Sequence, residues 1–245
     1  MLFEDRTDAG RRLAERLASY RGQDPVVLAL VRGGVPVAFE VARILACPLD
    51  IVLVRKIGAP GAPELAAGAV VDGATEETVL NPDVVAAWDI SESYIEAATR
   101  RERAEIERRR KLYLAERKRP PVAGRTAIVV DDGIATGASM RAALRAVRRQ
   151  GPKRLVAATP IAAEDTVAAL KADADEVVTV SMPPGLGAIG MYYLDFAQVS
   201  DAEVMDLLDR ARAWLPPAAT ANVACQPSPN RHDATEVNHG APDHS

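Results

Sequence analysis

The amino-acid sequence predicts an α/β protein with a mostly parallel sheet and helices on both faces. Short apolar runs typical of strands alternate along the chain with amphipathic stretches typical of helices. This alternation favours a parallel sheet, because crossover helices must cover the faces of the sheet. The chain has 245 residues, 48% of them hydrophobic and 26% charged. These values are ordinary for one sizeable globular domain with its own core.

The first half of the chain is expected to contain two strands of this sheet and an extended pair. The extended pair turns at Asp72-Gly73, and the stretch 57–62, rich in Gly, Ala and Pro, is interpreted as a loop. In order, we expect a helix over 7–20, a strand over 25–31, a helix over 36–45, a strand over 49–54, the pair 65–72 and 76–80, and a charged helix over 91–118.

The second half continues the alternation and ends in a segment of different composition. We expect strands over 127–130, 154–159 and 176–180, helices over 140–149, 163–171 and 201–214, and an irregular stretch over 182–198. From Pro216 onward, Pro, Ala, Asn, His and Ser dominate and large apolar residues are few. Such a segment cannot bury enough surface to offset its ordering entropy. We therefore predict a folded domain over 1–215 and a disordered tail over 216–245.

The most informative segment runs from Thr126 to Met140. An apolar strand stops at two adjacent carboxylates, Asp131 and Asp132, and a loop of small residues leads into a helix. Free amides at a helix start bind phosphate, hydroxyls add donors, and glycines allow close approach of the backbone. The carboxylates can accept hydrogen bonds from vicinal ribose hydroxyls or hold a divalent cation. The segment therefore indicates a site for a phosphorylated sugar. Its loop residues are Gly133, Ala135, Thr136, Gly137, Ala138 and Ser139.

Several other classes of protein are disfavoured by what the chain lacks. No Gly-x-x-x-x-Gly-Lys-Ser/Thr occurs, so the acids do not have the P-loop that a Walker B strand requires. All three histidines fall in the last fourteen residues, which argues against histidine-based catalysis or zinc ligation in the folded part. The net charge of −4 gives no bias toward nucleic acid. No apolar run is long enough for a membrane span, and a reduced cytoplasmic protein is expected.

The segment 126–140 resembles the phosphoribosyl-pyrophosphate (PRPP) motif of the type I phosphoribosyltransferases. The resemblance covers roughly residues 26–208. It implies transfer of ribose 5-phosphate from PRPP to a nitrogenous acceptor, with release of pyrophosphate and with Mg²⁺ as cofactor. By this resemblance, Asp131 and Asp132 are expected to bind the ribose hydroxyls and the metal, and residues 135–139 are expected to surround the 5-phosphate. A homodimer is the family's usual assembly. Some members of this fold instead bind PRPP, nucleotides or RNA as regulators, and this alternative stays open.

Two further groups are assigned to the pyrophosphate. Arg32, Gly33 and Gly34 follow the first strand, where the family has a pyrophosphate-binding loop. Arg55 and Lys56 end the second predicted strand, and two cations there suit the phosphates of PRPP. Because ligands sit beyond the carboxyl ends of parallel strands, all these groups are expected at one edge of the sheet.

The acceptor is expected under a hood formed by residues 181–199. This stretch contains a Gly-x-Gly-x-x-Gly, but the glycines lead into an aromatic run rather than a helix, which argues against a dinucleotide site. Tyr192 and Tyr193 either stack on the acceptor ring or pack the hood onto the core. Members that salvage 6-oxopurines carry a carboxylate where this chain has Ala135, so hypoxanthine and guanine are doubtful acceptors.

The charged helix over 91–118 mixes basic and acidic residues at helical spacing. Such a pattern is typical of an exposed face with intrahelical ion pairs, which is the interpretation we favour. The tract is nevertheless net basic, so a cover over the site or an RNA contact remains an alternative.

Overall fold

The structure, a computed structural model, describes residues 2–72, 77–114 and 118–213. The chain divides into two units after Leu215, and the predicted tail over 216–245 lies outside the described residues. Five parallel strands form the main sheet, in the order β2-β1-β6-β7-β8. Their bounds are β1 Pro25–Leu30, β2 Leu49–Val52, β6 Thr126–Val130, β7 Arg154–Ile161 and β8 Glu176–Ser181. The predicted fold class is therefore confirmed.

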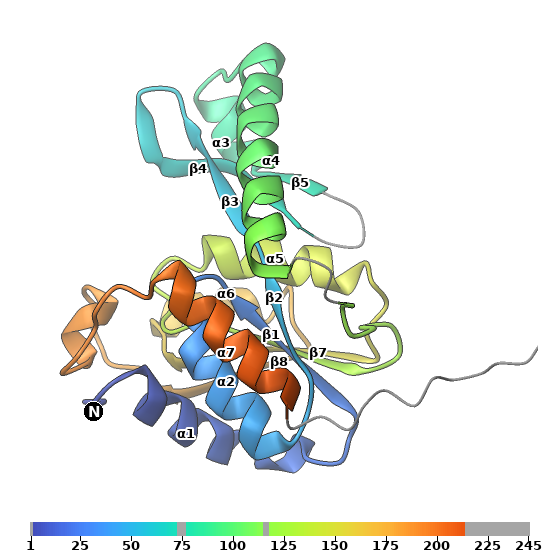
Figure 1. Ribbon diagram of the computed structural model, residues 1–245. Coiled ribbons are helices and arrows are strands. Elements are labelled where there is room, and N and C mark those ends of the chain that lie inside the picture. The colour runs from blue at the N-terminus through green and yellow to red at the C-terminus, as the bar shows by residue number, and fades with distance from the viewer. Residues whose placement is uncertain (1, 73–76, 115–117, 214–245) are drawn as a thin grey trace, which may run out of the picture. The chain divides into compact units, whose positions relative to one another are not determined.

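Helices cover both faces of this sheet (Figure 1). On one face lie α1 Arg6–Arg16, α2 Gly34–Leu45 and α7 Asp201–Ala213, and on the other lie α5 Ala138–Arg148 and α6 Glu164–Leu170. Neighbouring residues of β1 enter different cores: Val27 joins the cluster of α1 and α2, and Leu28 joins that of α5. Side chains of a strand point alternately to the two faces, so a strand buried on both sides is apolar throughout.

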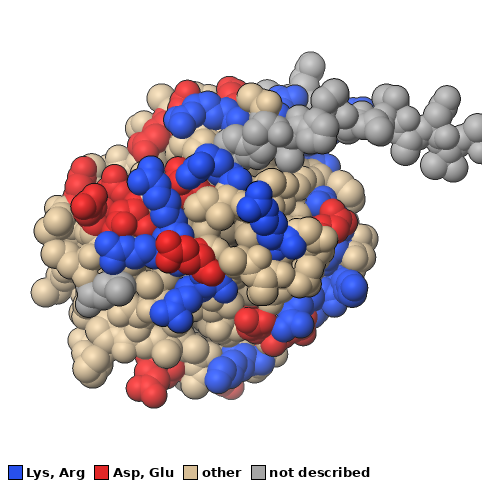
Figure 2. Space-filling model, turned by 90° about the horizontal axis from the view of Figure 1, so that it is seen from below, with Lys and Arg blue, Asp and Glu red and all other residues tan. Residues whose placement is uncertain are grey.

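The charge on one helical face is mixed. Figure 2 looks from below at the side where α1 and α2 lie, and it shows basic and acidic side chains interspersed. Ion pairs account for part of this pattern, such as Arg12 with Asp8 at 2.8 Å and Arg43 with Glu40 at 2.6 Å. This face therefore presents no extended area of one sign.

A second, antiparallel sheet of three strands was only partly expected. It contains β3 Val54–Ala59, β4 Ala62–Val71 and β5 Glu77–Leu80 and lies between α4 and α5 (Figure 1). The predicted pairing of 65–72 with 76–80 is confirmed for the described residues, while 73–76, which include Gly73 of the predicted turn, lie outside them. The predicted loop over 57–62 is wrong, because Ile57–Ala59 belongs to β3. Position 58 requires glycine because β3 and β4 approach each other closely at this point. A Cβ at Gly58 would lie 2.7 Å from backbone atoms of Pro63. Composition alone cannot distinguish that requirement from a loop.

Two helices follow this sheet. α3 Pro82–Ala87 was not expected, and it is too short for a periodic signal. α4 Glu92–Leu114 corresponds to the predicted helix over 91–118, of which 115–117 lie outside the described residues. Pairs such as Arg108–Glu105 and Arg110–Glu107 line its surface, as the spacing predicted. Among the described helices, none combines the length and apolar character that crossing a membrane requires.

The segment between β8 and α7 lies beside the N-terminus (Figure 1). It is irregular apart from the 3₁₀ turn η2 Ile189–Tyr192; another such turn, η1 Ala18–Tyr20, follows α1. The amide of Phe3 donates to the carbonyl of Tyr192 at 2.8 Å, and the amide of Leu194 donates to the carbonyl of Phe3 at 2.9 Å. The N-terminal residues thereby attach this segment, the hood, to the domain.

Candidate active site

Two adjacent carboxylates form the centre of the site. Asp131 and Asp132 follow β6 directly, and the amide of Asp132 donates to Oδ1 of Asp131 at 2.9 Å. Burial raises the pKa of Asp131 well above its ordinary value, and the neighbouring Asp132 charge raises it further. Burial also raises the pKa of Asp132, although a hydrogen bond from Arg6 opposes this. Two charges so close together and so little hydrated favour the approach of a cation or hydroxyl donors.

The loop after β1 lies directly against these acids. A Cβ at Gly33 would lie 2.1 Å from Oδ2 of Asp132, and one at Gly34 would lie 2.6 Å from the carbonyl oxygen of Val130. The contact follows from the register, in which Ala29 of β1 pairs with Val130 of β6. The peptide bond between Val31 and Arg32 is cis. Parallel pairing thus unites two segments that are about a hundred residues apart in the chain.

The loop from Gly133 to Gly137 connects the acids to the start of α5. A Cβ at Gly133 would lie 2.2 Å from the side chain of Ile189, so the hood touches the loop here. The hydroxyl of Thr166 donates to the carbonyl of Ala135 at 2.6 Å and holds the loop from outside. Gly137 has a φ of 73° and is the N-cap of α5, where it has no side chain to cap the first amides. A helix start of this kind offers its amides to an anion.

The basic residues assigned from the sequence are all in ion pairs. Nη1 of Arg32 lies 3.6 Å from Oδ1 of Asp201, which also accepts a hydrogen bond from the Tyr113 hydroxyl at 2.5 Å. Nε of Arg55 lies 3.0 Å from Oε2 of Glu102, a buried residue of α4. These contacts attach both arginines to acids on the helices around the site.

Arg55 and Lys56 do not end a strand of the parallel sheet, and this expectation is corrected. Both lie inside β3, because the chain leaves the main sheet after Val52 and pairs with β4 instead. Neighbouring strand residues point to opposite faces. Arg55 accordingly meets α4, whereas Lys56 faces α5 and pairs with Glu64 at 3.0 Å.

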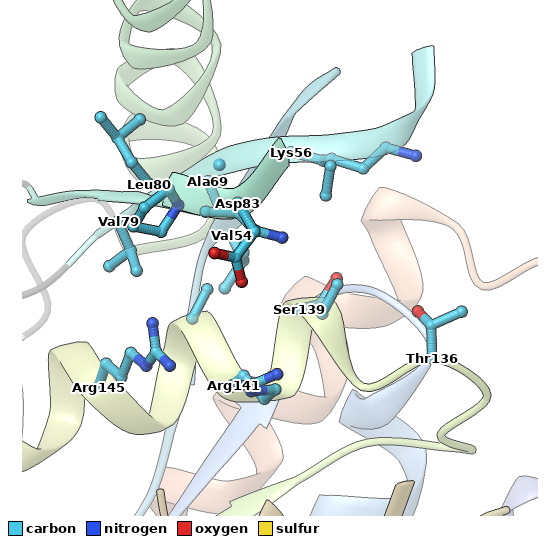
Figure 3. A pocket seen from close by; sticks show the side chains of 16 residues that line it. Val54, Lys56, Ala69, Val79, Leu80, Asp83, Thr136, Ser139, Arg141 and Arg145 are labelled. Atoms are coloured by element: carbon cyan, nitrogen blue, oxygen red, sulfur yellow. The ribbon is translucent and has the colours of Figure 1, made fainter. Parts of the chain in front are cut away.

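A pocket of about 410 Å³ lies between α5 and the second sheet (Figure 3). Lys56, Thr136 and Ser139 line the end at the hydroxyl loop. Arg141 and Arg145 line it further along α5, and each places its Nε 2.9 Å from the carboxylate of Asp173. These two arginines were not predicted from the sequence, because their spacing on an amphipathic helix indicates no more than a solvated face. The pocket thus combines hydroxyls, a helix start and positive charge.

A family model for the phosphoribosyl transferase domain matches residues 4–191. The chain belongs to this family. Among solved structures, the phosphoribosyl transferase domain described here resembles the protein TT1426 from Thermus thermophilus, with 47% identity and a TM-score of 0.73. That match covers 88% of this chain and 100% of the other.

Curated relatives include provisionally named phosphoribosyl transferases from two strains of Mycobacterium tuberculosis, H37Rv and CDC 1551. Each is 45% identical over 236 residues, which cover 96% of this chain and 53% of the relative. The chain thus spans about half the length of these phosphoribosyl transferases.

In this phosphoribosyl transferase domain, Tyr193 of the hood supports the backbone of the acid pair. Its side chain is only 5% exposed, its ring lies 5.3 Å from that of Phe3 and 4.9 Å from that of Phe196, and its hydroxyl donates to the carbonyl of Asp132 at 2.6 Å. Burial and the Asp132 charge raise the pKa of Tyr193. A ring buried in this way packs the hood onto the core, so the structure does not favour stacking on an acceptor. Tyr192 is half-buried against the same cluster.

Arg6 was missed by the sequence analysis. It comes from the first turn of α1, and its Nε lies 2.8 Å from Oδ2 of Asp132. An arginine in a helix that carries several arginines gives no sequence signal of this contact, which spans 126 positions along the chain.

The two carboxylates fit a Mg²⁺ ion held jointly by protein and ligand. Among residues 2–72, 77–114 and 118–213, no group of three or more His, Cys, Asp or Glu side chains could hold a metal. Mg²⁺ is commonly bound by one or two carboxylates together with water and phosphate oxygens of a substrate. Asp131 and Asp132 supply such a pair.

Proposed function

We propose that this domain transfers the ribose 5-phosphate unit of PRPP to a nitrogenous acceptor and releases pyrophosphate. The observation that carries the proposal is the contact between the two strand ends. The acids after β6 touch the glycine loop after β1 and lead into the hydroxyl loop at the start of α5. Each part matches one part of PRPP: the diol, the diphosphate and the 5-phosphate.

In this proposal, Asp131 and Asp132 accept hydrogen bonds from the ribose hydroxyls. Their raised pKa values make hydroxyl donors and a cation favourable partners, because both stabilise the ionised carboxylates. The hydroxyls of Thr136 and Ser139 and the first amides of α5 bind the 5-phosphate. Asp131 and Asp132 would hold Mg²⁺ together with the ligand, and the ion would supply positive charge for the diphosphate.

The cations stabilise the leaving pyrophosphate. Negative charge builds on the diphosphate as the sugar becomes cationic, so fixed positive groups favour the transition state over the ground state. Arg32 adjoins the glycine loop, and Lys56 lines the pocket with the hydroxyl loop. Arg55, on the other face of β3, is held by Glu102 and is assigned to support of α4 rather than to pyrophosphate.

The acceptor is a nitrogen nucleophile other than a 6-oxopurine. Ala135 is exposed in the loop and offers only a methyl group. It has no carboxylate to assist proton transfer at the purine N7. Ile189, which touches Gly133, gives this side of the site an apolar wall.

The test replaces both acids. Asp131→Asn with Asp132→Asn is expected to abolish pyrophosphate release from Mg²⁺ and PRPP across a panel of bases and amines. Each asparagine replaces one acceptor oxygen by an NH₂ donor and removes the negative charge that attracts the cation, while its similar shape preserves the fold. Glu164→Gln with Asp165→Asn is the matched control, since these are two adjacent exposed acids on α6. An active Asp131/Asp132 double variant would refute the assignment.

The alternative function is a regulator that binds PRPP or nucleotides without transfer. The observation that favours it is the pairing of Arg32 and Lys56 with acids, which weakens the charge offered to a leaving group. No pyrophosphate release with any acceptor, together with tight binding of PRPP or a nucleotide, would support the regulator. RNA binding by α4 is less favoured, because Arg108 and Arg110 pair with acids of the same helix.

A further inference from the structure

Arg6 joins three parts of the site that are distant in the sequence. Its Nε donates to Oδ2 of Asp132 at 2.8 Å, and its Nη1 donates to the carbonyl of Ala197 at 2.7 Å. Its guanidinium carbon lies 3.8 Å from the ring centroid of Phe196. The side chains of Arg6 and Asp132 are 12% and 14% exposed, so water screens the ion pair only weakly.

Two connections therefore link Asp132 to the hood, and they differ in kind. The Tyr193 hydroxyl holds the backbone carbonyl of Asp132, which carries no charge that a ligand could neutralise. Arg6 holds the carboxylate, which the proposed function assigns to the ribose hydroxyls and Mg²⁺. Only the second connection is open to competition by the ligand.

The space around the carboxylate makes this competition direct. Oδ2 of Asp132 faces Arg6, and it also faces Gly33, where a Cβ would lie 2.1 Å away. A cation that binds this oxygen takes the same negative charge that holds Arg6. When the carboxylate of Asp132 binds a cation instead of Arg6, the guanidinium is still held by its stacking on Phe196 and its hydrogen bond to the carbonyl of Ala197.

We propose that Arg6 is a positioning residue that neutralises Asp132 in the ligand-free site, anchors the hood to it, and yields the carboxylate to Mg²⁺ when the ion binds. The proposal rests on the proposed function only in the identity of the ligand. Linkage then requires a reciprocal effect: if the hood contact opposes cation binding, cation binding must loosen the hood by the same factor. A purely structural arginine would show no such coupling.

The experiment measures amide hydrogen exchange in the hood with and without Mg²⁺. The amides of Leu194 and Asp195 are the reporters, because they donate to Phe3 and Glu4 at the attachment of the hood. In the wild-type protein, saturating Mg²⁺ is expected to accelerate their exchange severalfold. In Arg6→Met, exchange is expected to be about tenfold faster without Mg²⁺, the loss expected for a charged hydrogen bond, and insensitive to the ion.

Arg12→Met is the matched control. Arg12 also belongs to α1, pairs with an acid, Asp8, and lies 5.5 Å from an aromatic ring centroid, that of Phe3, but it does not contact Asp132. Its variant should keep wild-type exchange and the wild-type response to Mg²⁺. An equal response to Mg²⁺ in Arg6→Met and wild type, or no response in wild type, would overturn the proposal.

Arg6→Lys covers the case in which Arg6→Met does not fold. Lysine keeps the charge but loses the planar fork that contacts Asp132 and Ala197 together. Faster hood exchange with a weakened Mg²⁺ response is expected, and wild-type behaviour would again overturn the proposal. Failure of PRPP to bind the wild-type protein in the presence of Mg²⁺ would instead refute the proposed function, and the exchange comparison with Mg²⁺ alone would still test the role of Arg6.

Discussion

Replacing Gly33 by alanine should separate ligand binding from folding. Gly33 has a φ of −58° and a ψ of −35°, which alanine adopts readily, so the backbone gives no reason for glycine. The added Cβ would lie 2.1 Å from Oδ2 of Asp132 and 2.7 Å from Cγ. An ordinary contact begins near 3.4 Å, so the carboxylate must move by about 1.3 Å.

The expected effect on PRPP binding is large. The shift breaks the 2.8 Å contact between Arg6 and Asp132 and displaces the group that accepts the ribose hydroxyls. Losing hydrogen bonds to a charged group costs roughly 1.5–3 kcal/mol, which corresponds to about a ten- to hundredfold loss of affinity. The expected effect on stability is only about 1 kcal/mol, because the obstructing atoms are the mobile end of a side chain.

The assay combines isothermal titration with Mg²⁺ and PRPP with thermal unfolding, and two glycines serve as comparisons. Gly34→Ala should unfold more easily, by about 2–3 kcal/mol, because its Cβ would meet the backbone of Val130. Gly22→Ala should lower the free energy of unfolding by about 1 kcal/mol, because Gly22 has a φ of 78°, which alanine adopts poorly. It should keep wild-type PRPP affinity, because an added Cβ at Gly22 would have no neighbouring atom within 4 Å. PRPP affinity in Gly33→Ala within about threefold of wild type, a difference of less than 1 kcal/mol, would refute the reasoning.

Two further predictions concern the acids and their support. Asp131→Asn should stabilise the fold by about 1–2 kcal/mol at pH values above the raised pKa of Asp131, because the wild-type protein loses stability as the pH rises from the ordinary carboxyl pKa through the raised one. The gain should vanish toward pH 3.8, the ordinary pKa, and a gain independent of pH in thermal unfolding would contradict it. Tyr193→Phe should cost about 1 kcal/mol in denaturant unfolding and weaken PRPP binding, through loss of its bond to Asp132. Tyr94→Phe, which loses a bond to Gly58, should cost similar stability but keep PRPP affinity; equal affinity losses would argue against the role of Tyr193.

Prediction from the sequence succeeded where local pattern and burial agree. Apart from Thr126, the strands at 25–30 and 126–130 are apolar because both faces of the sheet are covered, and Arg32 and Asp131 follow their ends. It failed where strand pairing overrode composition. The segment 57–59 resembles a loop, yet it pairs with β4, and this pairing sends Arg55 and Lys56 to opposite faces.

Local sequence patterns were sufficient to predict the α/β class, the segment that carries the acid pair and the hydroxyl loop, and the absence of a carboxylate at Ala135. These features are local: each depends on residues within one strand, turn or helix start. The contacts that distant groups make with the acids emerged from the three-dimensional structure, namely those of Gly33 in the loop after β1, Arg6 in α1 and Tyr193 in the hood. The physical reason is that such contacts depend on strand order and chain crossing, which no local spacing of residues encodes.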